Sequence, residues 1–130
     1  MSVHNIKSSN DFSTLLTSTQ YVVVDFHASW CGPCKAIAPT YAKFATDHSI
    51  PSYLAFARVD VDEVQELARQ YSVTAMPTFM FFKDGKQVAV NGQAVIRGAD
   101  VRSLSTAVEK LAGLAKGKRD IKEKEDGGKL

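Results

Sequence analysis

Two cysteines separated by two residues, Cys31 and Cys34, are the side chains best suited to chemistry in this 130-residue sequence. Thiols at this spacing can exchange a disulfide, contribute to a zinc site, or lie buried and inert. A structural zinc site takes four ligands, but there is no second cysteine pair, and His4, His27 and His48 follow no known ligand spacing. We therefore expect no bound metal and favour disulfide exchange, with the zinc site and the inert thiols as alternatives.

Disulfide exchange needs one acidic, accessible thiol that attacks and a second thiol that resolves the mixed disulfide. A Cys-x-x-Cys at the start of a helix supplies both. The unpaired amides and the dipole at the helix N-terminus favour the thiolate of the first cysteine, and the second lies about one turn inside. Between them, Gly32 permits a close approach of the chain, and Pro33 suits the first turn of a helix.

The elements around the cysteines predict a junction between a strand and a helix. Residues 21–27 form a β-branched and aromatic run, typical of a strand buried on both faces. Apolar residues recur at helical spacing after the cysteines, and Pro39 is expected to kink that helix. Further strands are expected at residues 3–6, 53–59 and 78–83. Helices are expected after the capping residues Ser9-Asn10-Asp11 and after a capping box formed by Asp62 and Gln65. A last helix is expected over residues 101–111, with its end at Gly113.

This order of elements predicts an α/β fold with a central mixed sheet flanked by helices. Helical crossovers connect parallel strands, and the tight turn at Asp84-Gly85 indicates an antiparallel pair. The length and the 45% apolar and 23% charged composition fit one globular domain, which we assign to residues 1–113. Residues 114–130 are polar and rich in glycine, and we expect them to be a disordered charged tail.

Charge and apolar runs argue against several classes of partner. Residues 113–130 hold six of the 16 Lys and Arg and four of the 14 Asp and Glu, so the preceding residues hold ten of each and are neutral. The basic balance therefore belongs to the tail, and we expect no nucleic-acid partner. No apolar run is long enough to span a membrane, and the N-terminus lacks the pattern of a signal or transit peptide. We expect a protein of the cytoplasm, with the nucleus as a second location.

The segment from Val24 to Lys35 (VDFHASWCGPCK) resembles the active-site signature of the thioredoxin family. The likeness continues in order through Pro39, Met76-Pro77-Thr78-Phe79 and Gly98, and covers about residues 3–112. It implies a thioredoxin-like fold and a protein disulfide reductase without a bound cofactor. Its redox-active disulfide would be reduced by NADPH through a separate thioredoxin reductase. The implied partners are that reductase and disulfide-containing client proteins, and we expect a monomer.

The resemblance also assigns roles to individual residues. Cys31 is expected to attack and Cys34 to resolve. Asp25 matches the buried carboxylate of the family, with a pKa raised by burial and a role as proton acceptor for Cys34 through water. Trp30 matches the indole beside the nucleophile.

Two further segments of the implied site lie far along the chain. Met76-Pro77 matches the cis-proline segment of the family, and the Met76 backbone is expected to pair with an extended substrate. Gly98 is expected to complete the apolar rim around the cysteines, although a plain turn before the last helix is an equal alternative.

The sequence departs from the family pattern at two places, and a tolerated loop insertion is the favoured interpretation of the second. Arg58 stands where the family often has lysine near the buried carboxylate, and it is either a partner of Asp25 or a solvated strand-edge residue. Residues 86–97 are longer than usual and contain Asn91-Gly92, which predicts a lengthened hairpin or a bulged edge strand. The leading alternative to a general reductase is a redox-capable adaptor domain of a larger assembly, bound through the rim of the cysteine site and the tail.

Overall fold

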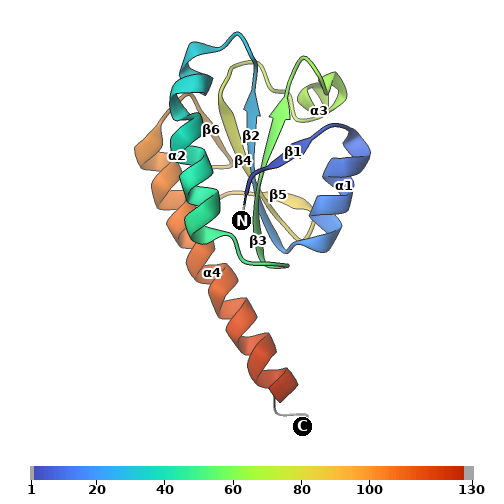
Figure 1. Cartoon of the computed structure of the whole chain (residues 1–130), viewed down its shortest axis with the longest axis vertical. Helices are drawn as coiled ribbons and strands as arrows, with labels where there is room; N and C mark the ends of the chain where they lie inside the picture. The colour runs from blue at the N-terminus through green and yellow to red at the C-terminus, as the bar shows by residue number, and fades with distance from the viewer. Residues whose placement is uncertain (1, 128–130) are drawn as a thin grey trace.

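The computed structural model describes residues 2–127, which form a six-stranded sheet between two layers of helices (Figure 1). The strands lie in the order β1-β3-β2-β4-β5, and β6 also pairs with β4. β1, β3 and β2 are parallel neighbours, whereas β4 runs antiparallel to β2, so the predicted mixed sheet is confirmed. The elements are β1 (His4–Ile6), α1 (Ser9–Ser18), β2 (Tyr21–His27), α2 (Gly32–His48), β3 (Leu54–Asp60), α3 (Gln65–Gln70), β4 (Thr78–Lys83), β5 (Lys86–Val88), β6 (Val95–Arg97) and α4 (Val101–Gly127).

The central strand β2 is buried on both faces because helices cover the sheet on each side. Its side chains alternate between two apolar clusters. Val23 packs with residues of α2 and α4, whereas Val24 and Phe26 pack with residues of α1 and α3. The same alternation places Asp25 on the face that α2 and α4 cover, which is the face over which the cysteine-bearing helix runs (Figure 1).

Side-chain caps at two helix starts differ from the sequence prediction. The hydroxyl of Ser8, one residue before the expected capping segment, accepts a hydrogen bond from the Asp11 amide at 3.1 Å and caps α1. The predicted capping box at Asp62 does not form, since Val64 occupies the cap of α3 and makes no side-chain cap bond. The Asp62 carboxylate instead accepts a hydrogen bond from the indole of Trp30.

The last helix is longer than the sequence predicted. α4 passes Gly113 and continues to Gly127, so its second half projects beyond the sheet (Figure 1). The prediction of a disordered tail is therefore wrong for residues 114–127, and residues 128–130 lie outside the described part. Two features favour helix there: Ala115 is fully buried in the core, and Lys122 pairs with Asp126 one turn away. Glycine weakens a helix interior by only about 1 kcal/mol, which such contacts offset.

The lengthened 86–97 segment forms an edge strand beside β4 that a loop interrupts, which is the bulged form of the two that the sequence predicted. β5 and β6 both pair with β4, and the residues between them leave the sheet as a small loop. Asn91 and Gly92 have φ values of +53° and +80°, and Val90 and Gln93 exchange backbone hydrogen bonds of 2.9 and 3.0 Å across them. This is the tight turn that the Asn-Gly pair predicted.

Within residues 2–127, no helix is both long enough and apolar enough to cross a membrane.

Candidate active site

The cysteine pair lies at the junction of β2 and α2, as the sequence predicted. Cys31 is the N-cap of α2, and its sulfur is bonded to that of Cys34 in a disulfide with a Cα–Cα distance of 5.3 Å. The Cys34 amide donates to the Cys31 sulfur at 3.2 Å, in the manner of a helix cap. After reduction, this N–H and the helix dipole would stabilise a thiolate at Cys31 rather than at Cys34.

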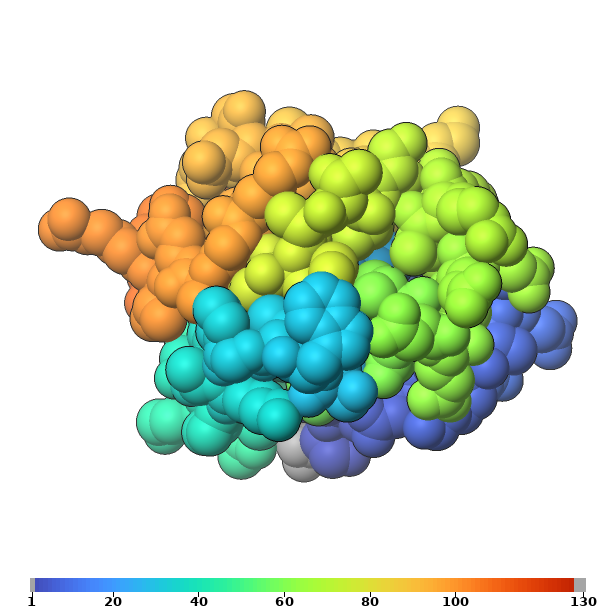
Figure 2. Space-filling view, turned by 90° about the horizontal axis from the view of Figure 1, so that it is seen from above, coloured from blue at the N-terminus to red at the C-terminus, as the bar shows by residue number. Residues whose placement is uncertain are grey.

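Both cysteines are buried, and Cys31 is slightly the more exposed residue. Cys31 is 5% exposed and Cys34 is 1% exposed, and both pack against Ala28 and the partly buried Met76. Gly32 and Pro33 occupy the first two positions of α2 and are exposed. Figure 2 shows this end of the molecule, where the cyan segment around residues 30–35 lies against the yellow-green segment that contains Met76. A partner disulfide can therefore approach Cys31 more readily than Cys34.

Trp30 stands beside the pair as the most exposed large apolar side chain of residues 2–127. It is 66% exposed, and its Nε1 donates to the Asp62 carboxylate at 2.9 Å. This bond fixes the indole on the surface next to Cys31. The sequence indicated Trp30 as a site residue but assigned Asp62 only to a helix cap. The available signal was that Asp62 lies two residues beyond the end of β3, and β3 ends at the same edge of the sheet as β2.

The segment that precedes β4 completes the rim of the site. The Met76–Pro77 peptide bond is cis, as expected from the family, and the Met76 carbonyl oxygen lies 3.7 Å from the Cys31 sulfur. The Gly98 amide donates to the Pro77 carbonyl at 2.8 Å, and Gly98 has a φ of +88°, which glycine adopts without strain. Gly98 therefore contacts the rim through Pro77, and its turn geometry supports that contact.

Asp25 is a fully buried carboxylate on β2. Burial is the main influence on this group and raises its pKa to about 6, while the positive charge of Arg58 opposes the rise. The two residues face each other in the parallel register of β2 and β3, with Arg58 Nε 3.4 Å from Asp25 Oδ2. The pair is not aligned as a hydrogen bond, and neither carboxylate oxygen accepts one from any described residue. Of the two alternatives for Arg58, the structure supports the partner of Asp25.

Tyr41 and His27 surround this charged pair. The Tyr41 hydroxyl is buried beneath α2 and lies 3.0 Å from the Val23 carbonyl and 2.8 Å from the Ala57 carbonyl. Burial raises its pKa well above the ordinary value, and the negative charge of Asp25 adds to the rise, so Tyr41 stays protonated. His27 is half-buried, and burial lowers its pKa. Helical spacing places Tyr41 on the apolar face of α2, but it does not reveal what the hydroxyl contacts.

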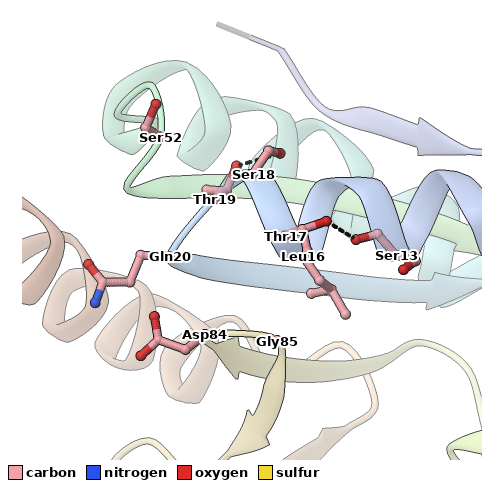
Figure 3. A pocket seen from close by; sticks show the side chains of 9 residues that line it. All are labelled: Ser13, Leu16, Thr17, Ser18, Thr19, Gln20, Ser52, Asp84 and Gly85. Atoms are coloured by element: carbon pink, nitrogen blue, oxygen red, sulfur yellow. Dashed lines mark hydrogen bonds between the residues drawn. The ribbon is translucent and has the colours of Figure 1, made fainter.

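Within residues 2–127, two other kinds of site can be compared with the cysteine site, a metal centre and a ligand pocket. In the described part of the chain, no group of three or more His, Cys, Asp and Glu side chains could hold a metal ion. A pocket of about 570 Å³ opens at the far end of the sheet, between the end of α1 and the turn at Asp84-Gly85 (Figure 3). Two of its hydroxyls bond to the backbone of α1: Thr17 donates to the Ser13 carbonyl at 2.7 Å, and Ser18 donates to the Leu15 carbonyl at 3.1 Å.

Comparison with known proteins agrees with this geometry. The Thioredoxin family model matches residues 2–110 of the chain. The chain belongs to the thioredoxin family. A thioredoxin-like protein of Fusarium culmorum is 66% identical over 113 residues, which cover 87% of this chain and 93% of that protein. A thioredoxin of Neurospora crassa is 62% identical over 116 residues, which cover 89% and 91%.

Solved structures give the same result for the fold. The structure of a Plasmodium falciparum thioredoxin superposes with a TM-score of 0.74 at 36% identity, covering 83% of this chain and 98% of that one. A Malassezia sympodialis thioredoxin gives a TM-score of 0.72 at 36% identity, covering 85% and 91%. The thioredoxin-like α/β fold is therefore confirmed.

Family membership and the bonded cysteine pair together define the activity. This thioredoxin-family chain is a thiol–disulfide oxidoreductase that reduces disulfide-containing substrates by dithiol–disulfide exchange through Cys31 and Cys34, and a reductase returns it to the dithiol form. The family uses no bound cofactor, so the electrons are carried by the cysteines themselves.

Proposed function

We propose that the two cysteines act in a fixed order, with Cys31 as the nucleophile and Cys34 as the resolving thiol. The Cys31 thiolate attacks one sulfur of a client disulfide, forms a mixed disulfide and releases the other client sulfur as a thiolate. The Cys34 thiol then loses its proton and attacks the Cys31 sulfur. The client disulfide is thereby reduced by two electrons to a dithiol, and Cys31 and Cys34 are oxidised to a disulfide. The observation that carries this order is the Cys34 amide at 3.2 Å from the Cys31 sulfur.

Asp25 is the proton acceptor for Cys34 in this scheme. Its carboxylate lies on the face of the sheet beneath α2, the helix that holds Cys34 in its first turn. A pKa of about 6 leaves the group ionised at neutral pH while keeping it basic enough to take a proton. Burial separates the carboxylate from solvent, and we propose that a water molecule relays the proton from the thiol.

The rim of the site binds an extended segment of the client. Trp30, Gly32 and Pro33 form one exposed side of the rim and the Met76–Pro77 segment, braced by Gly98, forms the other. The Met76 backbone next to Cys31 is placed to pair with a strand of the client that carries the target disulfide.

The proposed reductant is NADPH, through a separate thioredoxin reductase, and the proposed clients are disulfide-containing proteins. We place the activity in the cytoplasm, with the nucleus as a second location, because a dithiol carrier works where thiols are kept reduced. The protein acts as a monomer, without a nucleic-acid or membrane partner, and its catalytic domain extends past residue 113 to include Ala115 of α4.

NADPH-coupled reduction of a disulfide-bonded protein by wild type, Cys31→Ser and Cys34→Ser, with a thioredoxin reductase present, tests the proposal. Wild type should turn over, both variants should be inactive, and only Cys34→Ser should accumulate a mixed disulfide with the client, seen on a non-reducing gel. A mixed disulfide trapped by Cys31→Ser instead would reverse the order. No turnover by wild type, despite a reducible pair, would favour the adaptor function.

A truncation separates the reductase from the adaptor domain. The cut belongs after Lys118 rather than at residue 113, because Ala115 is fully buried in the core. A general reductase should keep nearly all of its activity without the projecting end of α4, whereas an adaptor bound through this segment would lose its assembly.

A further inference from the structure

A second cavity lies between α4 and the lengthened 86–97 segment, away from the cysteines. It has a volume of about 650 Å³, and its apolar lining comes from β2, the 86–97 segment and α4. Tyr21, the first residue of β2, and Lys83, the last residue of β4, both line it, whereas Cys31 follows the other end of β2. At about 3.3 Å per strand residue, the seven residues of β2 place this cavity roughly 20 Å from the redox site.

The lengthened 86–97 segment and the helix α4 build this cavity. Residues 88–92 form one wall, and Leu111, Leu114 and Lys118 of α4 form the other. Leu114 is 46% exposed and lies between the buried Leu111 and Ala115 on the same helix, so it adds an apolar side chain to the cavity wall. Leu114 and Lys118 also lie in the segment that the sequence alone did not predict to be helical.

The charge around this apolar cavity is of one sign. Lys83, Lys110 and Lys118 line it together with Asn91, and no acidic residue of the described chain does. Within residues 2–127, none of these three lysines forms an ion pair with a carboxylate, and the Lys83 ammonium lies 6.0 Å from the centre of the Tyr21 ring. An apolar floor with unpaired cations at its rim suits a ligand that carries both apolar and anionic groups.

The spacing of the cations narrows the class of ligand. Lys110 and Lys118 are eight positions apart on α4, which corresponds to about 12 Å along the helix axis. Two carboxylates at a similar separation would pair with these two ammonium groups more readily than one. An extended peptide covers about 13 Å in four residues, and its side chains at positions i, i+2 and i+4 point the same way. Two acidic residues four apart would meet the two lysines, with a large apolar residue midway above Leu114.

We propose that this cavity docks an extended segment of a partner protein, with the pattern acidic–x–apolar–x–acidic. Because the cavity lies at the opposite end of the sheet from Cys31, a docked partner leaves the redox site open to a client. Docking therefore does not depend on disulfide exchange, and it would hold the enzyme on a partner during turnover.

Calorimetric titration with the capped peptide Gly-Glu-Ser-Leu-Ser-Glu-Gly tests the proposal. Wild type should bind saturably, and a Cys31→Ser/Cys34→Ser double variant should bind equally well, so this result is separable from the proposed chemistry. Lys118→Glu and Lys110→Glu should each weaken binding at least tenfold. Lys116→Glu is the matched control, because it makes the same charge change on the same helix outside the cavity, and it should alter binding less than twofold.

Two altered peptides test the pattern itself. Replacing the central leucine with serine, or moving the two glutamates next to the leucine, should each weaken binding at least fivefold. Three results would overturn the proposal: no saturable binding at millimolar peptide, an equal loss in the Lys116→Glu control, or binding to vesicles of anionic lipid without binding to the peptide. Circular dichroism of each variant verifies folding, which the exposed lysines should not disturb.

Discussion

Replacing Asp25 with asparagine should stabilise the protein at neutral pH and leave its stability almost unchanged in acid. In the folded state the pKa of Asp25 is about 6, against an ordinary value of 3.8. Between about pH 4 and pH 6 the folded protein keeps a proton that the unfolded chain has released, so stability falls as pH rises through this range. Above pH 6 both states are ionised, and the full cost of the buried charge remains.

The magnitude follows from the size of the pKa rise. One pKa unit corresponds to about 1.36 kcal/mol, so a rise from 3.8 to about 6 is a penalty of about 3 kcal/mol at pH 8. The asparagine side chain would resemble the protonated carboxyl in shape and neutrality and would not carry this penalty. The gain in unfolding free energy should therefore grow from near zero at pH 4 to as much as about 3 kcal/mol at pH 8.

Urea unfolding of the oxidised wild type and Asp25→Asn at intervals from pH 4 to pH 8 measures this difference. Asp47→Asn is the control, because Asp47 is an exposed partner of Lys43 and its replacement should change stability by less than about 1 kcal/mol at every pH. A gain that is the same at all pH values, or a loss at pH 8, would refute the assignment of a raised pKa to burial. The same substitution should slow turnover, because Cys34 would lose its proton acceptor.

Three further predictions follow from the same structure. Arg58→Met should raise the pKa of Asp25 above 6, because it removes the cation that opposes the rise caused by burial. The pKa is measured by NMR from the chemical shift of the carboxyl carbon as a function of pH, and an unchanged value would contradict the pairing. Tyr41→Phe should lower the unfolding free energy by about 1–3 kcal/mol, because the buried carbonyls of Val23 and Ala57 lose the hydroxyl that they share as a donor. Urea unfolding measures this loss, and an unchanged free energy would show that the two carbonyls find other partners. Truncation after Lys118 should leave the thermal midpoint nearly unchanged, whereas truncation after Gly113 should lower it, because the second cut removes the buried Ala115.

The cysteine site was predictable because the residues that carry its chemistry lie within one short segment of the chain. Cys31 and Cys34 follow a buried strand and begin a helix, and both the spacing and the helix start are local properties. The cis bond at Met76–Pro77 and the position of Gly98 came from the family pattern, since neither follows from local preference alone. The Asn91-Gly92 turn was predictable because few residue pairs adopt two successive positive φ values.

The sequence by itself thus determined the order of elements, the strand–helix junction and the residues that carry the exchange chemistry. Only the tertiary structure decided which distant groups meet these residues. The pairing of Asp25 with Arg58 depends on the register of β2 and β3, and the bond from Trp30 to Asp62 depends on two strands ending side by side. The helix beyond Gly113 was also missed: Gly113 and Gly117 indicated a helix end, although the Lys, Arg, Glu and Ala residues around them are good helix formers. The burial of Ala115 against the core, which favours continuation, is a long-range contact that the sequence does not reveal.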